Sequence, residues 1–228
     1  MNLVYQYYTH NEIPKYAKLS SKMFKKYAER HGAEYHLETE MHVDAVFPTH
    51  ESHRVWQDPD FDRYDKILVV DMDIAITNYS KNILDEEIGH LAMKKEVWQG
   101  GRNKPLTDLR PEKLAHWDTI CKHFGYHRPE FVLNGGVQLW SWQGRQRARK
   151  EFMDPKEWAS FTGVIDKARK EQCYLNTMIH NHDFSVSLLD THWNQHGPHR
   201  FDKGKAIPGT FIHYTGDDGK TAMIKRYK

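Results

Sequence analysis

The sequence feature that most constrains the fold is a short apolar run that ends in two aspartates. Residues 66–70, Lys-Ile-Leu-Val-Val, are followed by Asp71, Met72 and Asp73. A β-branched run of this length is typical of a buried strand in a parallel sheet. Side chains two positions apart point to the same side of an extended segment, so both carboxylates can face one ligand. Because open α/β sheets bind ligands at the carboxyl ends of their strands, the pattern predicts an α/β fold with a polar site here.

Two clustered carboxylates repel each other unless a positive group lies between them, and a divalent cation that carries a phosphate is the usual solution. The spacing alone says little, because residues 58–60 and 60–62 have the same Asp-x-Asp pattern. Those matches contain Pro59 or lie next to it, follow no apolar run, and are interpreted as a solvated turn. The preceding strand distinguishes Asp71 and Asp73, which are predicted to bind a metal ion.

Length and charge narrow the class of protein. The chain has 228 residues, enough for one large α/β domain, and 33 Lys and Arg against 31 Asp and Glu argue against a dedicated nucleic-acid binder. No apolar run reaches the 18 residues of a membrane-spanning helix, and no secretory signal is recognised. Cys121 and Cys173 form no CxxC pair, so neither a disulfide framework nor a structural zinc site is indicated. A cytoplasmic location is expected.

Hydrophobic periodicity predicts alternating strands and helices in a single domain without internal repeats. Strands are expected at residues 3–8, 34–37, 67–71, 97–99, 137–140, 184–189 and 210–214. Helices are expected from Pro14 to a stop at Gly32, and at residues 52–57, 83–91, 111–124, 145–152 and 171–179.

Three further polar stretches allow both a plain and a functional interpretation. Residues 134–136, Asn-Gly-Gly, are either a tight turn or bulge, or a place where the backbone approaches a bulky ligand. Residues 213–220 begin with His213 and end in a glycine-rich loop at Lys220. They are either an ordinary polar turn, or a segment in which His213 binds a metal ion and Lys220 contacts a phosphate. Glu171 and Gln172 open an apolar helix, where an acid can simply complement the helix dipole.

The sixteen histidines raise the question of a zinc site. They are densest at residues 180–182 and 192–199. The HExxH pattern is absent, and Gly197-Pro198 ends any helix in the second group. A solvated loop is the preferred interpretation of residues 192–199.

Together these motifs resemble those of glycosyltransferases with the GT-A fold, and most of all glycosyltransferase family 8, which includes glycogenin and bacterial lipopolysaccharide galactosyltransferases. The resemblance extends over residues 3–220, with its motifs in the family's order. It implies a Rossmann-like, mixed but mostly parallel central sheet flanked by helices. It also implies a nucleotide-binding half in residues 1–76 and an acceptor-binding half in residues 77–228 of a single domain. The motifs are residues 61–73, 134–137, 171–176, 189–194 and 213–220.

The resemblance also implies ligands and the residues that bind them. The donor would be a nucleotide sugar, most often UDP-linked, held through Mn²⁺ or alternatively Mg²⁺, and the acceptor would be a glycan or other hydroxyl compound. The metal ligands would be Asp71, Asp73 and His213. The catalytic residues would be Gln172, which matches the residue near the anomeric carbon, together with Glu171 and Asp73. Contacts to the donor are assigned to Tyr7, Tyr8, Thr9, Arg54, Asp71, Met72, Asn134, Gly135, Gly216 and Lys220.

The resemblance implies retention of anomeric configuration, by front-face displacement or by a covalent step on Glu171. Two other functions stay open. A haloacid-dehalogenase-like Mg²⁺ phosphatase would use Asp71 as its nucleophile, but that family expects Gly-Thr or similar after the second Asp, where this chain has Ile74-Ala75. A non-catalytic carbohydrate-binding protein, suggested by the seven tryptophans, would bind glycans without metal-dependent affinity for nucleotides.

Overall fold

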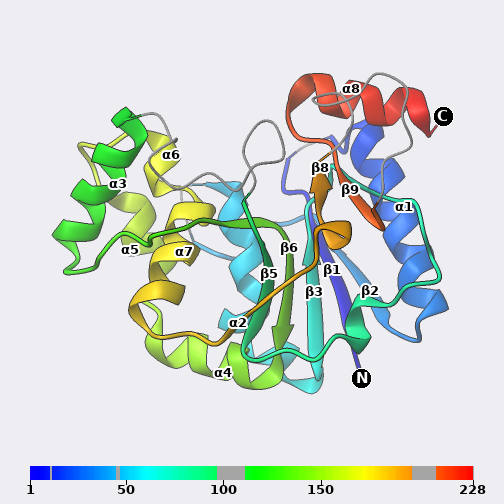
Figure 1. The fold of residues 1–228 in the computed structure, drawn as a ribbon, viewed down its shortest axis with the longest axis horizontal. Helices are drawn as coiled ribbons and strands as arrows, with labels where there is room; N and C mark the ends of the chain where they lie inside the picture. Colours follow the sequence, from blue (N-terminus) through cyan, green and yellow to red (C-terminus); the bar gives the residue numbers. More distant parts are fainter. Residues whose placement is uncertain (11, 45–46, 97–110, 197–208, 228) are drawn as a thin grey trace.

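A six-stranded central sheet organises the molecule in the computed structural model, which describes residues 1–10, 12–44, 47–96, 111–196 and 209–227 (Figure 1). The strand order is β2-β1-β3-β6-β5-β7. All of these strands except β6 run in one direction, which confirms the mixed, mostly parallel sheet. The strands are β1 (Leu3–Tyr7), β2 (Glu34–Glu38), β3 (Lys66–Val70), β5 (Leu91–Lys95), β6 (Leu133–Ser141) and β7 (Val186–Leu188).

A second, three-stranded sheet joins the C-terminal part of the chain to the end of β3. It consists of β4 (Ile74–Ile76), β9 (Phe211–His213) and β8 (Gln195–His196), in that order. Strands β4 and β9 are antiparallel, with Ile74 opposite His213. Because β4 begins directly after the two aspartates, this pairing places a C-terminal histidine beside them.

Helices lie on both sides of the central sheet (Figure 1). Helices α1 and α8 lie on the side of β4 and β9, and α2, α4 and α7 lie on the other. No helix in the described ranges is long and apolar enough to span a membrane. The helices are α1 (Lys15–Arg30), α2 (Arg54–Gln57), α3 (Pro111–His123), α4 (Trp142–Glu151), α5 (Pro155–Ser160), α6 (Asp166–Arg169), α7 (Glu171–Asn181) and α8 (Gly216–Arg226), with 3₁₀ turns η1 (Pro48–His53), η2 (Pro59–Arg63), η3 (Ile83–Asp85) and η5 (Thr191–Trp193).

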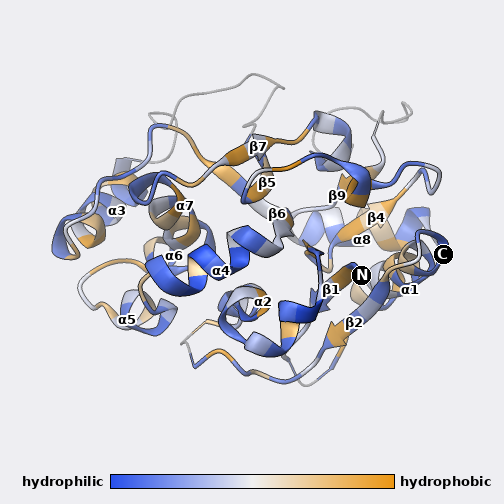
Figure 2. Ribbon diagram, turned by 90° about the horizontal axis from the view of Figure 1, so that it is seen from below, coloured by the Kyte–Doolittle hydropathy of each residue, from blue (hydrophilic) through white to orange (hydrophobic). Residues whose placement is uncertain are grey.

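Alternate side chains of the central strands enter two separate cores. In β3, Ile67 and Val69 pack on the side of α2 and α7, whereas Leu68 and Val70 pack on the side of α1. Each buried side chain of this size contributes about 1.5–3 kcal/mol of transfer free energy. Figure 2 shows β4 coloured hydrophobic, while α4 presents mainly hydrophilic residues. Burial on both faces explains why residues 67–70 form a continuous apolar run.

Several predicted elements are confirmed and others are wrong. The helix predicted at residues 83–91 is instead a 3₁₀ turn followed by β5, a strand that was not predicted. The glycine-rich loop expected from residue 216 is helix α8. The turn expected at 58–62 is the 3₁₀ helix η2, in which Asp58 caps the first turn and Phe61 is buried. The strand predicted at 97–99 lies outside the described residues.

The Asn-Gly-Gly stretch lies inside β6 and is not a turn. Met93 of β5 pairs with Gln138, but its neighbour Lys94 pairs with Asn134. The residues between those partners on β6 therefore form a bulge, one of the interpretations that the sequence allowed. The bulge brings the carbonyl oxygen of Gly136 to within 2.9 Å of the Asp71 backbone nitrogen, so it lies against the end of β3.

Candidate active site

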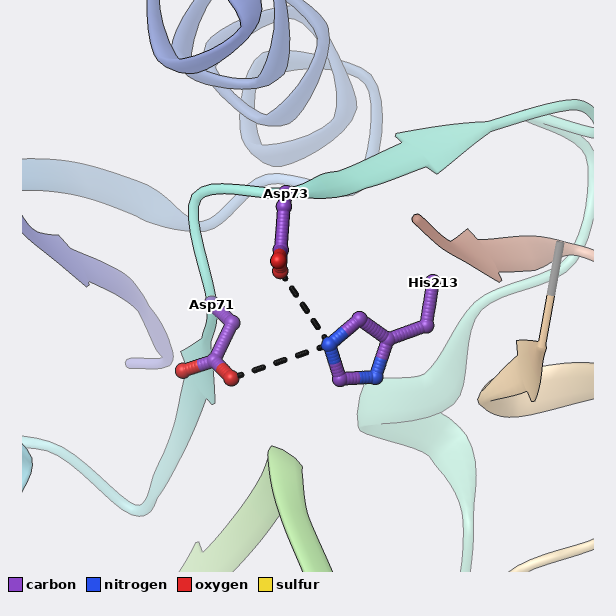
Figure 3. Close-up of side chains that lie close together, drawn as sticks. All are labelled: Asp71, Asp73 and His213. Carbon is purple, nitrogen blue, oxygen red and sulfur yellow. Dashed lines mark ion pairs between the residues drawn. The ribbon is translucent and has the colours of Figure 1, made fainter. Parts of the chain in front are cut away.

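Asp71, Asp73 and His213 converge at the carboxyl end of β3 (Figure 3). Asp71 directly follows β3, Asp73 directly precedes β4, and His213 is the last residue of β9. The Nε2 atom of His213 is 3.1 Å from Asp73 Oδ1 and 3.8 Å from Asp71 Oδ2. The three potential ligand atoms lie within 4.8 Å of one another, close enough to share one metal ion. Within the described part of the chain, no other group of three acidic, histidine or cysteine side chains does so.

Main-chain hydrogen bonds hold both aspartates in place. The backbone nitrogen of Asp71 donates to Gly136 on the β6 bulge, and the backbone nitrogen of Tyr214 donates to the carbonyl of Asp73 at 2.8 Å. The turn between β3 and β4 is thereby attached to two neighbouring strands. The sheets therefore fix the main chain of both aspartates, and the side chain of His213 contacts both carboxylates.

Each of the three groups affects the charge of the other two. Burial and the neighbouring Asp73 carboxylate raise the pKa of Asp71 to about 6. Burial also disfavours the ionised form of Asp73, but the charge and hydrogen bond of His213 outweigh it and hold the pKa of Asp73 below its usual value. The same carboxylates raise the pKa of His213 against the effect of its burial. A positive charge between the aspartates is therefore favoured electrostatically.

The cluster opens into a cavity of about 400 Å³. The cavity includes Asp71, Asp73 and His213, and the candidates predicted from the sequence that also line it are Asn134, Gly135, Glu171 and Gln172. Gly136, of the predicted Asn-Gly-Gly stretch, also lines it, and sequence reasoning missed three further polar lining residues, which are Glu96, Lys113 and His196.

The two glycines of the bulge make room for protein side chains. A Cβ atom on Gly135 would lie 2.7 Å from Glu171 Oε1, and one on Gly136 would lie 2.4 Å from His213 Cε1. Both distances are far below van der Waals contact. The Asn-Gly-Gly pattern therefore allows Glu171 and His213 to approach the strand, in addition to any ligand.

Glu171 is buried at the start of α7, where it accepts a hydrogen bond from Gln138 Nε2 at 3.1 Å. Burial, with the nearby Asp71 carboxylate, raises its pKa to about 8. Gln172, the next residue, donates from Nε2 to Glu96 Oε2 at 3.4 Å. Glu96 follows β5 directly, so the rule that found Asp71 would have found it if β5 had been predicted.

The remaining predicted donor contacts lie around the cavity but do not line it. The hydroxyl of Tyr7 donates to the carbonyl of Thr49 at 3.4 Å. Arg54 forms ion pairs with Glu38 and Asp58 and does not line the cavity. Met72 is buried, Tyr8 and Thr9 follow β1 and are half-buried, and Gly216 and Lys220 lie in the first turns of α8.

The charge of Lys220 reaches both aspartates. Its ammonium group favours the ionised forms of both Asp71 and Asp73 and lies 5.1 Å from the centre of the Tyr16 ring. Gly216 begins α8 with a φ angle of +76°, a conformation that glycine adopts without strain. The histidine group at 192–199 is not a solvated loop as far as it is described, because His196 is buried in β8 with its ring stacked on His213.

The arrangement of strands and helices is the GT-A-like fold of glycosyltransferases. One similar solved structure is a glycosyltransferase involved in the glycosylation of the major capsid of PBCV-1. It is 13% identical, with a TM-score of 0.59, over 97% of this chain and 98% of that one. The bifunctional glycosyltransferase WbbM in its apo form is also 13% identical, with a TM-score of 0.59, over 98% of this chain and 49% of that one.

The galactosyltransferase LgtC, in complex with donor and acceptor sugar analogs, is 13% identical with a TM-score of 0.52, over 100% of this chain and 96% of that one. A variant of LgtC with an active-site glutamine changed to glutamate gives a TM-score of 0.54. Neither a protein-family model nor a curated protein matches the sequence. At this level of identity the likeness establishes the fold.

Proposed function

We propose that the protein is a metal-dependent glycosyltransferase that moves a sugar from a UDP-linked donor to a hydroxyl group of a glycan or other acceptor. The observation that carries the proposal is the Asp71–Asp73–His213 cluster at the carboxyl end of a central strand. The fold also supports the proposal, because it is similar to that of glycosyltransferases, one of which was solved with donor and acceptor sugar analogs.

The donor set determines which ion fits the cluster. Two carboxylates and one imidazole make a mixed oxygen and nitrogen shell, which suits Mn²⁺ better than Mg²⁺, although Mg²⁺ can also bind carboxylates. The His213 side chain already stabilises the ionised form of Asp73, as a cation at this position would. A bound cation would supply the positive charge that stabilises the leaving diphosphate.

Residues of β1 and α8 complete the proposed donor site. Lys220 is assigned to the diphosphate because its charge already acts on both aspartates, and the N-terminal amides of α8 next to Gly216 would add positive potential. Tyr7, Tyr8 and Thr9 are assigned to the base or ribose, in a nucleotide-binding half that ends at residue 76. Arg54 would have to exchange its ion pairs before it could contact the nucleotide.

Glu171 and Gln172 are assigned to the transferred sugar. With a pKa of about 8, Glu171 is mostly protonated at neutral pH, so it can donate a hydrogen bond to a sugar hydroxyl and is a poor nucleophile. This state favours front-face displacement over a covalent step for a retaining reaction. The amide nitrogen of Gln172 is directed at Glu96, which leaves its oxygen for the anomeric centre. The active-site glutamine of LgtC supports this assignment.

The two alternative functions have less support. A phosphatase would need Asp71 as a free nucleophile, but a histidine lies between Asp71 and its neighbour Asp73 and interacts with both. A carbohydrate-binding protein would not need a partly buried cluster of two carboxylates and a histidine, which is costly to maintain without a ligand of opposite charge. The cluster therefore favours transfer.

Incubation with a panel of nucleotide sugars and Mn²⁺, with released nucleotide as the readout, tests the proposal. We expect release from at least one UDP-sugar, abolished by a chelator and unchanged in Asp60→Ala, which removes an exposed aspartate from the unrelated Asp-x-Asp pattern. Hydrolysis of p-nitrophenyl phosphate without any reaction of UDP-sugars would instead identify a phosphatase. Glycan binding without nucleotide affinity in Mn²⁺ would identify a carbohydrate-binding protein.

A further inference from the structure

A chain of buried polar side chains lies directly behind the histidine of the proposed metal site. Asn194, between η5 and β8, is fully buried. Its Nδ2 atom donates to Asn134 Oδ1 at 2.8 Å, and its Oδ1 atom lies 3.1 Å from Nδ1 of His213. The buried ammonium group of Lys94 donates to the backbone oxygen of Asn194 at 2.8 Å and fixes its main chain. Both amide atoms of Asn194 are therefore in use.

The direction of each hydrogen bond follows from groups that can only donate or only accept. The backbone nitrogen of Gly136 donates to Asn134 Oδ1 at 3.0 Å, and the Glu96 carboxylate accepts from Asn134 Nδ2 at 2.6 Å. These two partners fix the orientation of the Asn134 amide from both ends. Asn194 must then donate to Asn134 through Nδ2, which turns its Oδ1 atom toward His213.

The proton on the imidazole is fixed by the same argument. An amide oxygen can only accept, so Nδ1 of His213 must carry the proton that it shares with Asn194. In the neutral ring, the lone pair is then on Nε2. This is the atom that lies 3.1 Å from Asp73 and 3.8 Å from Asp71. The opposite tautomer would leave Nδ1 and Asn194 Oδ1 as two facing acceptors.

We propose that Asn194 is a positioning residue of the metal site, which sets the tautomer and ring orientation of His213 so that Nε2 is available to the cation. The inference rests on the proposed metal site and adds a residue to it. Outer partners of this kind typically change metal affinity about 10–100-fold. Through Asn134 and Glu96 the same network reaches Gln172, so it links the metal ligand to the residue assigned to the anomeric centre.

Two substitutions separate the acceptor and donor functions of the Asn194 amide. Asn194→Leu removes both functions in a side chain of similar size. Asn194→Asp keeps an acceptor for His213 but loses the donor to Asn134. Thr177→Val is the matched control, because Thr177 is also fully buried and hydrogen-bonded, to Trp117 Nε1 at 2.9 Å, but does not line the cavity.

Two quantities are measured by electron paramagnetic resonance. The first is the Kd for Mn²⁺ without nucleotide. The second is the hyperfine coupling between the bound Mn²⁺ and a ¹⁴N nucleus, seen in pulsed experiments, which reports whether the His213 imidazole binds the ion. We expect Asn194→Leu to raise the Kd about 10–100-fold and to lose the nitrogen coupling, while the control matches the wild type. Asn194→Asp should retain the coupling with a Kd within about threefold of the wild type, and lose transfer activity through the broken link to Asn134.

Wild-type affinity and coupling in Asn194→Leu would overturn the role of Asn194 while leaving the metal site intact. Loss of the nitrogen coupling in a folded Asn194→Asp variant would equally contradict the proposed role, because the acceptor for His213 is still present. If near-ultraviolet circular dichroism shows that Asn194→Leu does not fold, the result for Asn194→Asp alone tests the role of Asn194. Failure of the wild-type protein to bind Mn²⁺ would overturn the proposed function and this inference together.

Discussion

The carboxylate side of the cavity and the amide side behind His213 are built in different ways. Asp71 and Asp73 lie two residues apart on one turn between β3 and β4. Asn134, Asn194 and Glu96 come from separate elements, 38 and 60 residues apart along the chain. One side is a local feature of the sequence, whereas the other exists only after the sheets have formed.

This difference predicts different consequences of mutation. The carboxylates carry the charge themselves, and main-chain hydrogen bonds to β6 and β9 hold them. The amide side includes the Glu96 carboxylate in the cavity wall, and its hydrogen bonds hold Gln172 and His213 in place. Because the members of such a network depend on one another, removing one is expected to shift the others. Mutations on the carboxylate side should therefore remove function directly, and those on the amide side should act through geometry.

The largest effect is expected on the carboxylate side. Asp71→Ala or Asp73→Ala should reduce kcat/KM for transfer at least about 10²-fold, equivalent to about 2.7 kcal/mol of barrier, because each removes a ligand and a negative charge. Steady-state kinetics with the donor identified from the panel is the measurement. Turnover close to that of the wild type in either variant, with Mn²⁺ chelated, would refute the metal site.

Gly136→Ala is expected to have the next largest effect. The added Cβ would lie 2.4 Å from His213 Cε1, so the imidazole must move and the Kd for Mn²⁺ should rise at least about 10-fold. Gly135→Ala is the matched comparison, because its Cβ would meet Glu171 Oε1 instead. It should leave Mn²⁺ binding close to normal and reduce transfer. Equal Mn²⁺ affinities in the two variants would show that the bulge does not position His213.

Gln172→Ala should lower kcat about 10-fold or more while UDP affinity in Mn²⁺ changes little, because its amide is assigned to the sugar and not to the nucleotide. Kinetics and calorimetry on the same preparation give both quantities. Equal losses in kcat and UDP affinity would remove the special role of Gln172. An unchanged kcat would show that Gln172, and with it the amide network, does not contribute to the sugar-transfer step.

The last effect is on stability rather than on activity, and it concerns Glu171. Its pKa is about 8 in the folded protein against an ordinary value of 4.5, so the folded state retains a proton that the unfolded state releases. The stabilising contribution is fully present below pH 4.5 and is lost as the pH rises to about 8. Relative to Glu171→Gln, which does not titrate, the wild type should lose up to about 1.4 kcal/mol per pH unit in this window.

Urea denaturation of both proteins between pH 5 and pH 8 measures this difference. Parallel stability curves would show that the Glu171 carboxyl is not protonated in the folded protein. In that case Glu171 could act as a nucleophile, and a covalent step would be as consistent with the structure as front-face displacement.

The same comparison explains how much could be predicted from the sequence. Residues 66–73 could be predicted because the apolar strand and the two acids after it are adjacent in the sequence. The structure confirms the strand. Strand β5 was missed because it ends in two lysines, one of which is buried against the backbone oxygen of Asn194. Helix α8 was missed because Gly216 and Gly219 weaken its helical pattern. Glu96 and Asn194 adjoin unpredicted strands, so their contacts could not be inferred from their positions in the sequence.

Calorimetry of UDP binding, with Mn²⁺ and with a chelator, tests the central claim most directly, since the claim is that one cation held by Asp71, Asp73 and His213 binds the diphosphate of the donor. We predict measurable UDP binding in Mn²⁺ that weakens at least about 10-fold with the chelator, and an equal weakening in Asp73→Asn with Mn²⁺ present. UDP affinity that is the same with and without Mn²⁺, or unaffected by Asp73→Asn, would contradict the account.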